Sequence, residues 1–222
     1  MNTILVVAPH PDDETLGCGG AVLRHLHEGC QVHWLIVTDI TPELGYNSGQ
    51  IADREKEIAK VAEFLGFAEV HRLGFPTTRL DSLPSGDIVS GIAKVIEKTA
   101  CRMIYLPFIG DAHSDHRVVF EAGAACSKWF RRSSLRIVRA YETPSETDFG
   151  RNPCCAGFRP NLFLDITPHL EGKVAALKLY RGETDEFPFP RSEEAIRALA
   201  ALRGAASGFR AAEAFMSILE II

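Results

Sequence analysis

The sequence lacks three patterns that mark particular classes of protein. No apolar run approaches the roughly 18 residues of a membrane span, and the opening run is too short for a signal peptide. The 24 basic and 29 acidic residues stand without long runs of one sign, so no surface for nucleic acid is expected. The cysteines form no CxxC pair, and several lie in apolar segments where a free thiol fills core space. They are Cys18, Cys30, Cys101, Cys126, Cys154 and Cys155. These absences predict a cytoplasmic protein that meets neither nucleic acid nor membrane and acts on a small molecule.

Apolar segments typical of buried strands alternate along the chain with segments typical of helices. We expect strands at residues 4–8, 32–38, 69–73, 103–106, 135–141 and 162–166. We expect helices at residues 15–28, 50–65, 87–98, 115–130, 170–180 and 192–202. Repeated βα units predict an α/β fold with a mostly parallel, doubly wound, Rossmann-like sheet. No repeat, low-complexity tract or linker interrupts residues 1–222, so a single domain is expected.

Two polar motifs follow expected strands. The first, PHPDDE, comes after the first strand, and the second, DAHSDH, comes after the fourth. Because the carboxyl ends of parallel strands meet at one edge of the sheet, these loops can bring His10, Asp13 and His116 together. Two imidazoles and one carboxylate suit a catalytic zinc ion that keeps a fourth position for water. Asp12, the remaining carboxylate, is then placed to act as a base.

Simpler interpretations of these residues stay open. Asp13 or Glu14 alone could be a helix cap or a first-turn charge, and His113 with His116 could form a surface cluster. The occurrence of two such motifs at two strand ends favours the metal site. A phosphate loop is a poor fit for the nearby glycines, since no Gly-Lys-Ser/Thr follows and the carboxylates would repel phosphate. Close packing of the helix on the sheet explains them better: Gly17, Gly19 and Gly20. Five further histidines without partner spacing are interpreted as surface or core residues: His25, His27, His33, His71 and His169.

The two motifs, at this spacing on repeated βα units, resemble the LmbE-like or PIG-L family of zinc-dependent N-deacetylases. Members of that family remove the acetyl group from molecules that contain N-acetylglucosamine. The segment REKE, residues 54–57, is similar to the family's RxxE segment, and residues 203–204 and 212–215 are similar to its bacterial C-terminal region. The resemblance covers most of the chain and implies an LmbE-like fold.

The resemblance implies that His10, Asp13 and His116 hold zinc and that Asp12 is the general base. The chemistry of these residue types leads to the same roles. Bound zinc lowers the pKa of its water to about 7 and polarises a carbonyl, so a carboxylate beside it can take the proton while hydroxide attacks. The same carboxylate can return the proton to the leaving amine.

Three more residues are expected to take part in the reaction. His113, oriented by Asp115 and protonated when it acts, is expected to stabilise the oxyanion of the tetrahedral intermediate. Arg54 occupies a position that the resemblance marks as part of the active site. It is expected to contact substrate or oxyanion, with a simple ion pair to a neighbouring acid as the alternative.

The sequence departs from the family pattern where the substrate would bind. Ser114 stands where many members have proline, which leaves every ligand intact. Asp111 stands where some members have a tyrosine, and no helper role is assigned to it. The loop GFPTTR lacks the aspartate that many members use to bind sugar hydroxyls. That task is assigned to nearby polar residues: Thr77, Thr78, Asp39 or Asp81. Residues 143–160 and 183–190 are expected to be rims of the cleft or plain surface connections.

We therefore expect a hydrolase of carbon–nitrogen bonds in linear amides, a zinc-dependent N-deacetylase that releases acetate from an N-acetylglucosamine-type sugar or its conjugate. Iron or another divalent ion could replace zinc. One alternative is an amidase that cleaves a larger amide in a thiol conjugate or natural product. Alternatives of other classes are a nucleotide-binding module and a metal-binding protein without catalysis. A homo-oligomer stays open, and the apolar residues 215–222 could be an edge strand or an interface.

Overall fold

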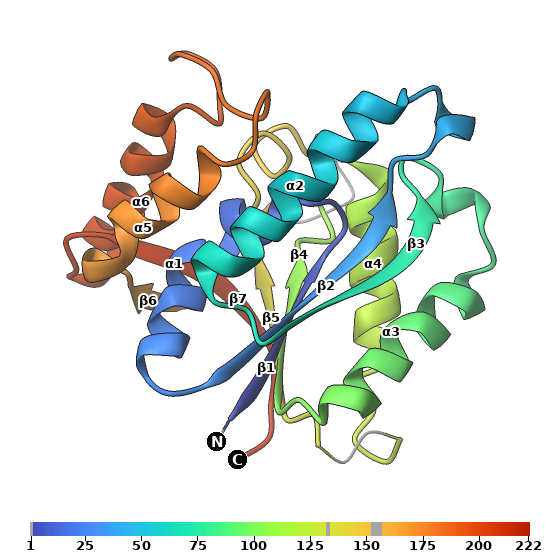
Figure 1. Ribbon diagram of the computed structural model, residues 1–222. Helices are drawn as coiled ribbons and strands as arrows, with labels where there is room; N and C mark the ends of the chain where they lie inside the picture. The colour runs from blue at the N-terminus through green and yellow to red at the C-terminus, as the bar shows by residue number, and fades with distance from the viewer. Residues whose placement is uncertain (1, 132–133, 152–156) are drawn as a thin grey trace.

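All described strands lie in one seven-stranded sheet (Figure 1). The computed structural model describes residues 2–131, 134–151 and 157–222. The strand order is β3-β2-β1-β4-β5-β7-β6, in which β3 to β5 run parallel and β7 runs antiparallel to both of its neighbours. The strands are β1 Thr3–Ala8, β2 Gln31–Asp39, β3 Glu69–Pro76, β4 Met103–Pro107, β5 Ile137–Tyr141, β6 Leu162–Asp165 and β7 Ala212–Glu220. The expected α/β fold with a mostly parallel, doubly wound sheet is confirmed.

Helices cover both faces of the sheet (Figure 1). The helices are α1 Asp13–His27, α2 Ser48–Leu65, α3 Ser85–Thr99, α4 Ser114–Ala125, α5 Leu170–Leu177 and α6 Glu193–Ser207, with short 3-10 turns η1 Pro42–Leu44, η2 Leu80–Ser82 and η3 Thr167–His169. Along β1, Ile4 and Val6 enter the core that α1, α2 and α5 cover, whereas Leu5 and Val7 enter the core beneath α3 and α4. A strand buried on both faces must be continuously apolar, which is why the first six-residue strand reads TILVVA.

The centre of the sheet places the two polar motifs side by side. β1 and β4 are neighbours, although two βα units separate them in the sequence. The chain leaves β1 toward α1 on one face and leaves β4 toward α4 on the other (Figure 1). This reversal of strand order is the switch point at which open α/β sheets bind ligands, beyond the carboxyl ends of the strands.

Two sequence expectations about element ends are wrong. Helix α4 ends at Ala125, before the expected residue 130, because the Ser127 hydroxyl donates to the Ala124 carbonyl at 2.7 Å and competes with further helix. Trp129 and Phe130 beyond it are 66% and 64% exposed, so continuing the helix would bury no apolar face. The last strand, β7, is no edge strand: it pairs with β5 on one side and β6 on the other.

Two glycines let α1 pack directly on the sheet. A Cβ atom at Gly17 would lie 2.1 Å from the ring of Tyr141, and one at Gly20 would lie 2.8 Å from Ile166. These distances are far below van der Waals contact, so only glycine allows this close approach. The prediction that these glycines serve helix packing is confirmed, which removes the main support for a phosphate loop.

Helix α1 is kinked where it passes the sheet. Cys18 has φ −146° and ψ 21°, outside the helical range. The backbone N–H groups of Gly20 and Ala21 donate to the Glu213 carboxylate at 2.9 and 2.7 Å, and the Lys173 ammonium lies 2.6 Å from the same carboxylate. Because buried N–H groups need partners, Glu213 stabilises the second part of the helix as a cap would. The segment 212–215 therefore supports the helix that opens the site.

Among the described cysteines, Cys18, Cys30 and Cys101 are free thiols. Cys18, Cys101 and Cys126 are buried, as expected of side chains that fill core space, while Cys154 and Cys155 lie outside the described residues. Among the helices of the described part, none combines the length and apolar character that crossing a bilayer requires.

Candidate active site

Three donor atoms converge beyond the carboxyl ends of β1 and β4. Asp13 Oδ2 lies 3.3 Å from His10 Nδ1 and 3.3 Å from His116 Nε2. Ligands of a tetrahedral ion with bonds of about 2.0–2.1 Å lie about 3.3 Å apart, so these spacings fit a single divalent ion. Asp13 and His116 are almost fully buried, and His10 is partly exposed on the pocket side. The structure thus brings together the three residues that the sequence assigned to the metal, and the donor set suits zinc.

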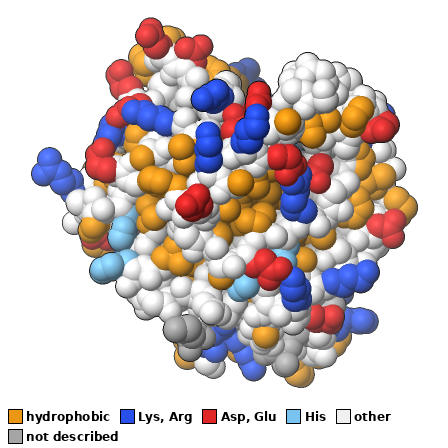
Figure 2. All heavy atoms as spheres, viewed as in Figure 1, with side chains coloured by type: hydrophobic (Ala, Val, Ile, Leu, Met, Phe, Trp, Pro, Cys, Tyr) orange, Lys and Arg blue, Asp and Glu red, His pale blue; other side chains and the backbone are white. Residues whose placement is uncertain are grey.

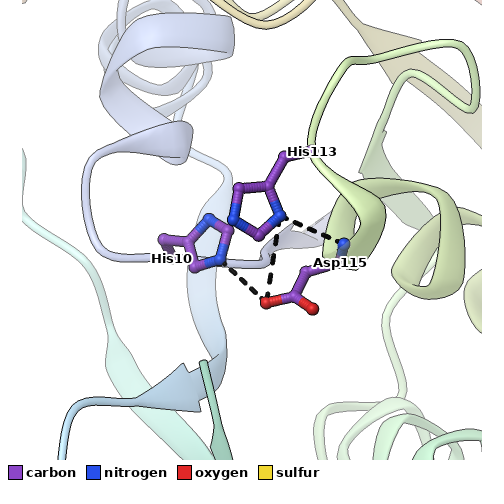
Figure 3. A group of neighbouring side chains, drawn as sticks. All are labelled: His10, His113 and Asp115. Atoms are coloured by element: carbon purple, nitrogen blue, oxygen red, sulfur yellow. Dashed lines mark hydrogen bonds and ion pairs between the residues drawn. The ribbon is translucent and has the colours of Figure 1, made fainter. Parts of the chain in front are cut away.

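The second ring nitrogen of each of these histidines faces a carboxylate. His10 Nε2 lies 3.1 Å from Asp115 Oδ2 (Figure 3), and His116 Nδ1 lies 2.8 Å from Asp111 Oδ2. Metal-binding histidines almost always carry such a partner, which fixes the tautomer and orients the ring. Both imidazoles are therefore oriented to present their other nitrogen toward Asp13.

The carboxylates control the protonation of the two histidines. Burial opposes the charged form of His10, but Asp115 and Asp13 raise its pKa to about 9. Burial likewise opposes the charged form of His116, but Asp13 and Asp111 raise its pKa to about 10. The pKa of Asp13 is held well below its usual value because the two histidines outweigh its burial. Near pH 7 the site without a metal ion therefore holds protons on the nitrogens that would bind one.

The Asp12 carboxylate lines the same cavity as the three donor atoms and pairs with an arginine. The backbone of Asp12 has φ 127° and ψ −30°, and its N–H donates to Glu14 Oε2 at 3.0 Å. Its carboxylate accepts a 2.6 Å hydrogen bond from Arg191 Nη1. Burial and the charge of Asp13 raise the pKa of Asp12 well above its usual value, while Arg191 opposes this rise. A carboxylate with a raised pKa beside the donor atoms suits a group that first takes a proton and then returns it.

Glu14 supports this turn from inside the protein. Its side chain is fully buried, and it accepts hydrogen bonds from the hydroxyls of Thr15 and Tyr180 at 2.6 and 2.7 Å. Burial raises the pKa of Glu14 to about 7 despite these bonds. Glu14 is therefore a partner of the backbone at Asp12 and does not face the donor atoms.

His113 differs from the sequence expectation in its partner and its charge. Its Nδ1 accepts a hydrogen bond from the backbone N–H of Asp115 at 3.1 Å, and the Asp115 carboxylate is 4.0 Å away, closer to His10 (Figure 3). Burial and the nearby His10 lower the pKa of His113 to about 4. The ring is neutral near pH 7, with its hydrogen on Nε2, so the expectation of a charged His113 oriented by the Asp115 carboxylate is not supported.

A cavity of about 240 Å³ opens over these residues. Acidic and basic side chains lie close together on the upper part of the face in Figure 2. Four of the five residues that the sequence offered for substrate binding line the cavity, namely Arg54, Asp39, Thr77 and Thr78. Asp81 is not among the lining residues. Arg54 donates to Glu183 at 2.6 Å, so it also makes the neighbouring ion pair weighed as its alternative. Asp39 is paired with Arg72.

The expected rims contribute to this cavity in part. Glu146 from the first segment and Glu183 from the second line it, together with Arg191, which directly follows the second segment. Residues 152–156 of the first segment lie outside the described residues.

Comparison with known proteins supports this assignment of the site. The chain matches the PIG-L family, described as GlcNAc-PI de-N-acetylase, over residues 5–127. That range spans more than half of the chain and contains both polar motifs. The chain belongs to the PIG-L family.

Three similar proteins align with nearly the whole chain. The diacetylchitobiose deacetylase of Thermococcus kodakarensis is 26% identical over 238 aligned positions, which cover 96% of this chain and 82% of the relative. The structure of the conserved protein TT1542 from Thermus thermophilus is 29% identical, with a TM-score of 0.77 over 100% of this chain and 97% of that one. GalB, the 4-carboxy-2-hydroxymuconate hydratase from Pseudomonas putida, shares the fold at 20% identity and a TM-score of 0.77, over 100% of this chain and 98% of GalB. Because a hydratase shares the fold, the residues of the site must decide the chemistry.

Sequence reasoning missed two residues of this PIG-L site. Asp111 received no role, yet it holds His116 and accepts a 2.6 Å hydrogen bond from the Thr147 hydroxyl. Its position inside the second motif was an available signal, because a metal-binding histidine calls for a carboxylate partner. Arg191 reaches Asp12 from 179 residues away, and no local pattern marks it.

Proposed function

We propose that this PIG-L protein is a metal-dependent N-deacetylase, with zinc as the expected ion, that releases acetate from an N-acetylglucosamine-type sugar or its conjugate. One observation carries the proposal: His10, Asp13 and His116 converge at ligand spacing while the Asp12 carboxylate lies beside them in the same cavity. A metal site that only stabilises a fold is typically closed by four protein ligands. Three ligands next to a carboxylate that is not itself a ligand suit hydrolysis.

The roles of the side chains follow from their contacts. When bound, a divalent ion supplies a Lewis acid to the acetamide carbonyl and lowers the pKa of a water molecule. Asp12 accepts a proton from the attacking water as the new C–O bond forms, and it gives that proton to the nitrogen as the C–N bond breaks. Arg191 holds the Asp12 carboxylate in place through the 2.6 Å hydrogen bond. The products are acetate and a free amine.

His113 acts as a neutral hydrogen-bond donor in this proposal. Its Nδ1 is occupied by the backbone N–H of Asp115, so Nε2–H is the group available to the cavity. Donors fixed before the reaction stabilise the oxyanion of an acyl-transfer intermediate without reorganising. His113 thereby supports the developing charge without carrying a charge of its own, and Asp115 serves mainly to orient His10.

The charges in the cavity favour a neutral substrate. The described lining contains five carboxylates and three guanidinium groups, namely Asp12, Asp13, Asp39, Glu146 and Glu183 with Arg54, Arg72 and Arg191. Each of these arginines is already paired with a carboxylate. The described lining therefore offers no unpaired cation to a phosphate or carboxylate group of a substrate, and a bound dication would balance the remaining acidic charge. An uncharged acetamido sugar, with its hydroxyls near Thr77 and Thr78, fits this cavity best.

The test combines metal analysis with product analysis. Purified protein is assayed for zinc and iron content and for amine release from N-acetylglucosamine and N,N′-diacetylchitobiose, before and after chelation. We expect about one ion per chain at this site and amine release that stops on chelation and returns with zinc. Asp12→Asn, which keeps all three ligands, should retain the ion but lose turnover. Metal-independent activity, or no activity with the metal bound, would refute the proposal.

The same assay separates the alternatives. An amidase of larger amides would release amine from longer acyl derivatives faster than from the acetyl compound. The amount of acetate released would then be smaller than the amount of amine. A nucleotide-binding module would be protected by nucleotide in a thermal shift without metal. The close contact of Gly17 with Tyr141 argues against this second alternative, since the glycines serve packing and leave no loop to hold phosphate.

A further inference from the structure

A second pair of histidines lies at the other end of the sheet. His33 in β2 and His71 in β3 point to the same face, where His33 Nδ1 lies 3.2 Å from His71 Nε2. Glu69, which is opposite His33 in the strand register, has its carboxylate 3.6 Å from His71 Nδ1. The strands β2 and β3 run next to each other at the sheet edge, with α3 on the same side (Figure 1). Sequence reasoning had interpreted both histidines as ordinary surface or core residues.

The spacing of these rings matches that of the active-site pair. The ring centroids of His33 and His71 are 5.4 Å apart, and those of His10 and His116 are also 5.4 Å apart. The 3.2 Å separation of the facing nitrogens is close to the roughly 3.3 Å between two ligands of a tetrahedral zinc ion. One ligand atom from each of His33, Glu69 and His71 falls within 4.8 Å of the others. We propose that His33 and His71 form a second site for a divalent metal ion such as zinc, with Glu69 as the carboxylate partner of His71.

The two facing nitrogens are the ones available to an ion. One hydrogen lies between His33 Nδ1 and His71 Nε2, and an ion can replace it when that ring carries its hydrogen on the opposite nitrogen. In His71 the opposite nitrogen, Nδ1, faces the Glu69 carboxylate.

One neighbouring group opposes metal binding. The Lys98 ammonium of α3 forms an ion pair with Glu69 and faces the same cluster. Its positive charge repels a dication bound beside the two imidazoles. Removal of the Lys98 charge should therefore strengthen the site, whereas loss of either imidazole should abolish it. A pair of histidines that merely bond to each other predicts neither effect on metal binding.

The second site is separate from the first. His33 stands near the start of β2, and Asp39 at the end of the same strand lines the active-site cavity. Six residues of extended chain span about 20 Å. Metal bound at the second site therefore contacts none of the residues proposed for catalysis, and the two ions can be counted independently.

The experiment counts zinc by equilibrium dialysis of the full chain at pH 7.5. We expect two ions per chain in the parent protein and one in His33→Gln and His71→Gln, with the chelator-sensitive activity of these variants unchanged. Glu69→Gln should weaken the second site about 10- to 100-fold. Lys98→Gln should tighten it. His27→Gln is the matched control, because His27 and His169 form another close pair, at 5.9 Å between ring centroids. Within the described residues, this pair belongs to no group of side chains that could hold a metal ion.

Three results would overturn the proposal. The first is a single ion per chain in the parent protein. The second is retention of two ions by both His33→Gln and His71→Gln. The third is loss of the second ion in His27→Gln, which would place it on the other histidine pair. His33 is partly exposed, so His33→Gln is expected to fold even if the more buried His71→Gln does not.

Discussion

Asp111 should contribute strongly to metal affinity although it is no ligand. Asp111 Oδ2 bonds His116 Nδ1 at 2.8 Å, and Oδ1 accepts the Thr147 hydroxyl at 2.6 Å. In Asp111→Asn the amide offers one oxygen where the carboxylate offered two, so either His116 or Thr147 loses its acceptor, and the negative charge is lost. Removal of such a partner typically weakens metal binding by about 10- to 100-fold, or about 1.4–2.7 kcal/mol.

The assay is zinc competition against a chromogenic chelator at fixed pH. Asp81→Asn is the control, because Asp81 is exposed and does not line the cavity, and its zinc affinity should equal that of the parent protein. His116→Ala should lose the active-site ion altogether. If Asp111→Asn bound zinc within about threefold of the parent while His116→Ala lost the ion, Asp111 would not orient the ligand and the geometric reasoning would be refuted.

Three further predictions follow from contacts in and near the site. Asp12→Asn should keep the metal ion and reduce kcat about 10²- to 10⁴-fold, as steady-state kinetics would reveal; a near-normal kcat would remove Asp12 from the mechanism. The pKa values of His10 and His116 are raised to about 9 and about 10, so metal binding at pH 7 should release up to two protons. The metal affinity should therefore rise from pH 6 to 9. Calorimetry in buffers of different ionisation enthalpy measures the number of protons released, and a metal affinity that does not change with pH would contradict the prediction. Gly17→Ala should lower the free energy of unfolding in urea by about 1–3 kcal/mol, because the added methyl group would overlap the ring of Tyr141. Gly86→Ala is the control, since a Cβ atom there meets open space. Equal stabilities of the two variants would show that α1 shifts without cost.

Much of the fold could be predicted because buried strands and amphipathic helices leave distinct local patterns. The strand β1 is apolar at nearly every position because both of its faces are covered, and α2 ends at Gly66, whose φ of 77° favours glycine. The position of β7 could not be predicted. A strand's place in the sheet depends on which distant strands pair with it, and β7 joins β5 and β6 through contacts that no local pattern encodes.

The candidate site divides in the same way. The three proposed ligands lie in two short motifs, so their residue types and spacing were visible in the sequence. The carboxylates that orient the two histidines were harder to predict, since an aspartate at a helix start is equally typical of a capping residue. The sequence assigned Asp115 to His113, yet its carboxylate is closer to His10. This contact joins residues 105 positions apart, and no local pattern predicts it. Arg191 arrives from still further along the chain.

The backbone at Asp12 explains how two consecutive aspartates serve different tasks. With φ 127° at Asp12, the Asp13 carboxylate turns toward the two histidines, while the Asp12 carboxylate turns toward Arg191. Such a conformation costs about 1–3 kcal/mol in a residue other than glycine and persists only where its surroundings hold it. Glu14 holds the Asp12 N–H, and Arg191 holds its carboxylate. The strain therefore lies where the proposed mechanism needs the Asp13 carboxylate to bind the ion and the preceding Asp12 carboxylate to move a proton.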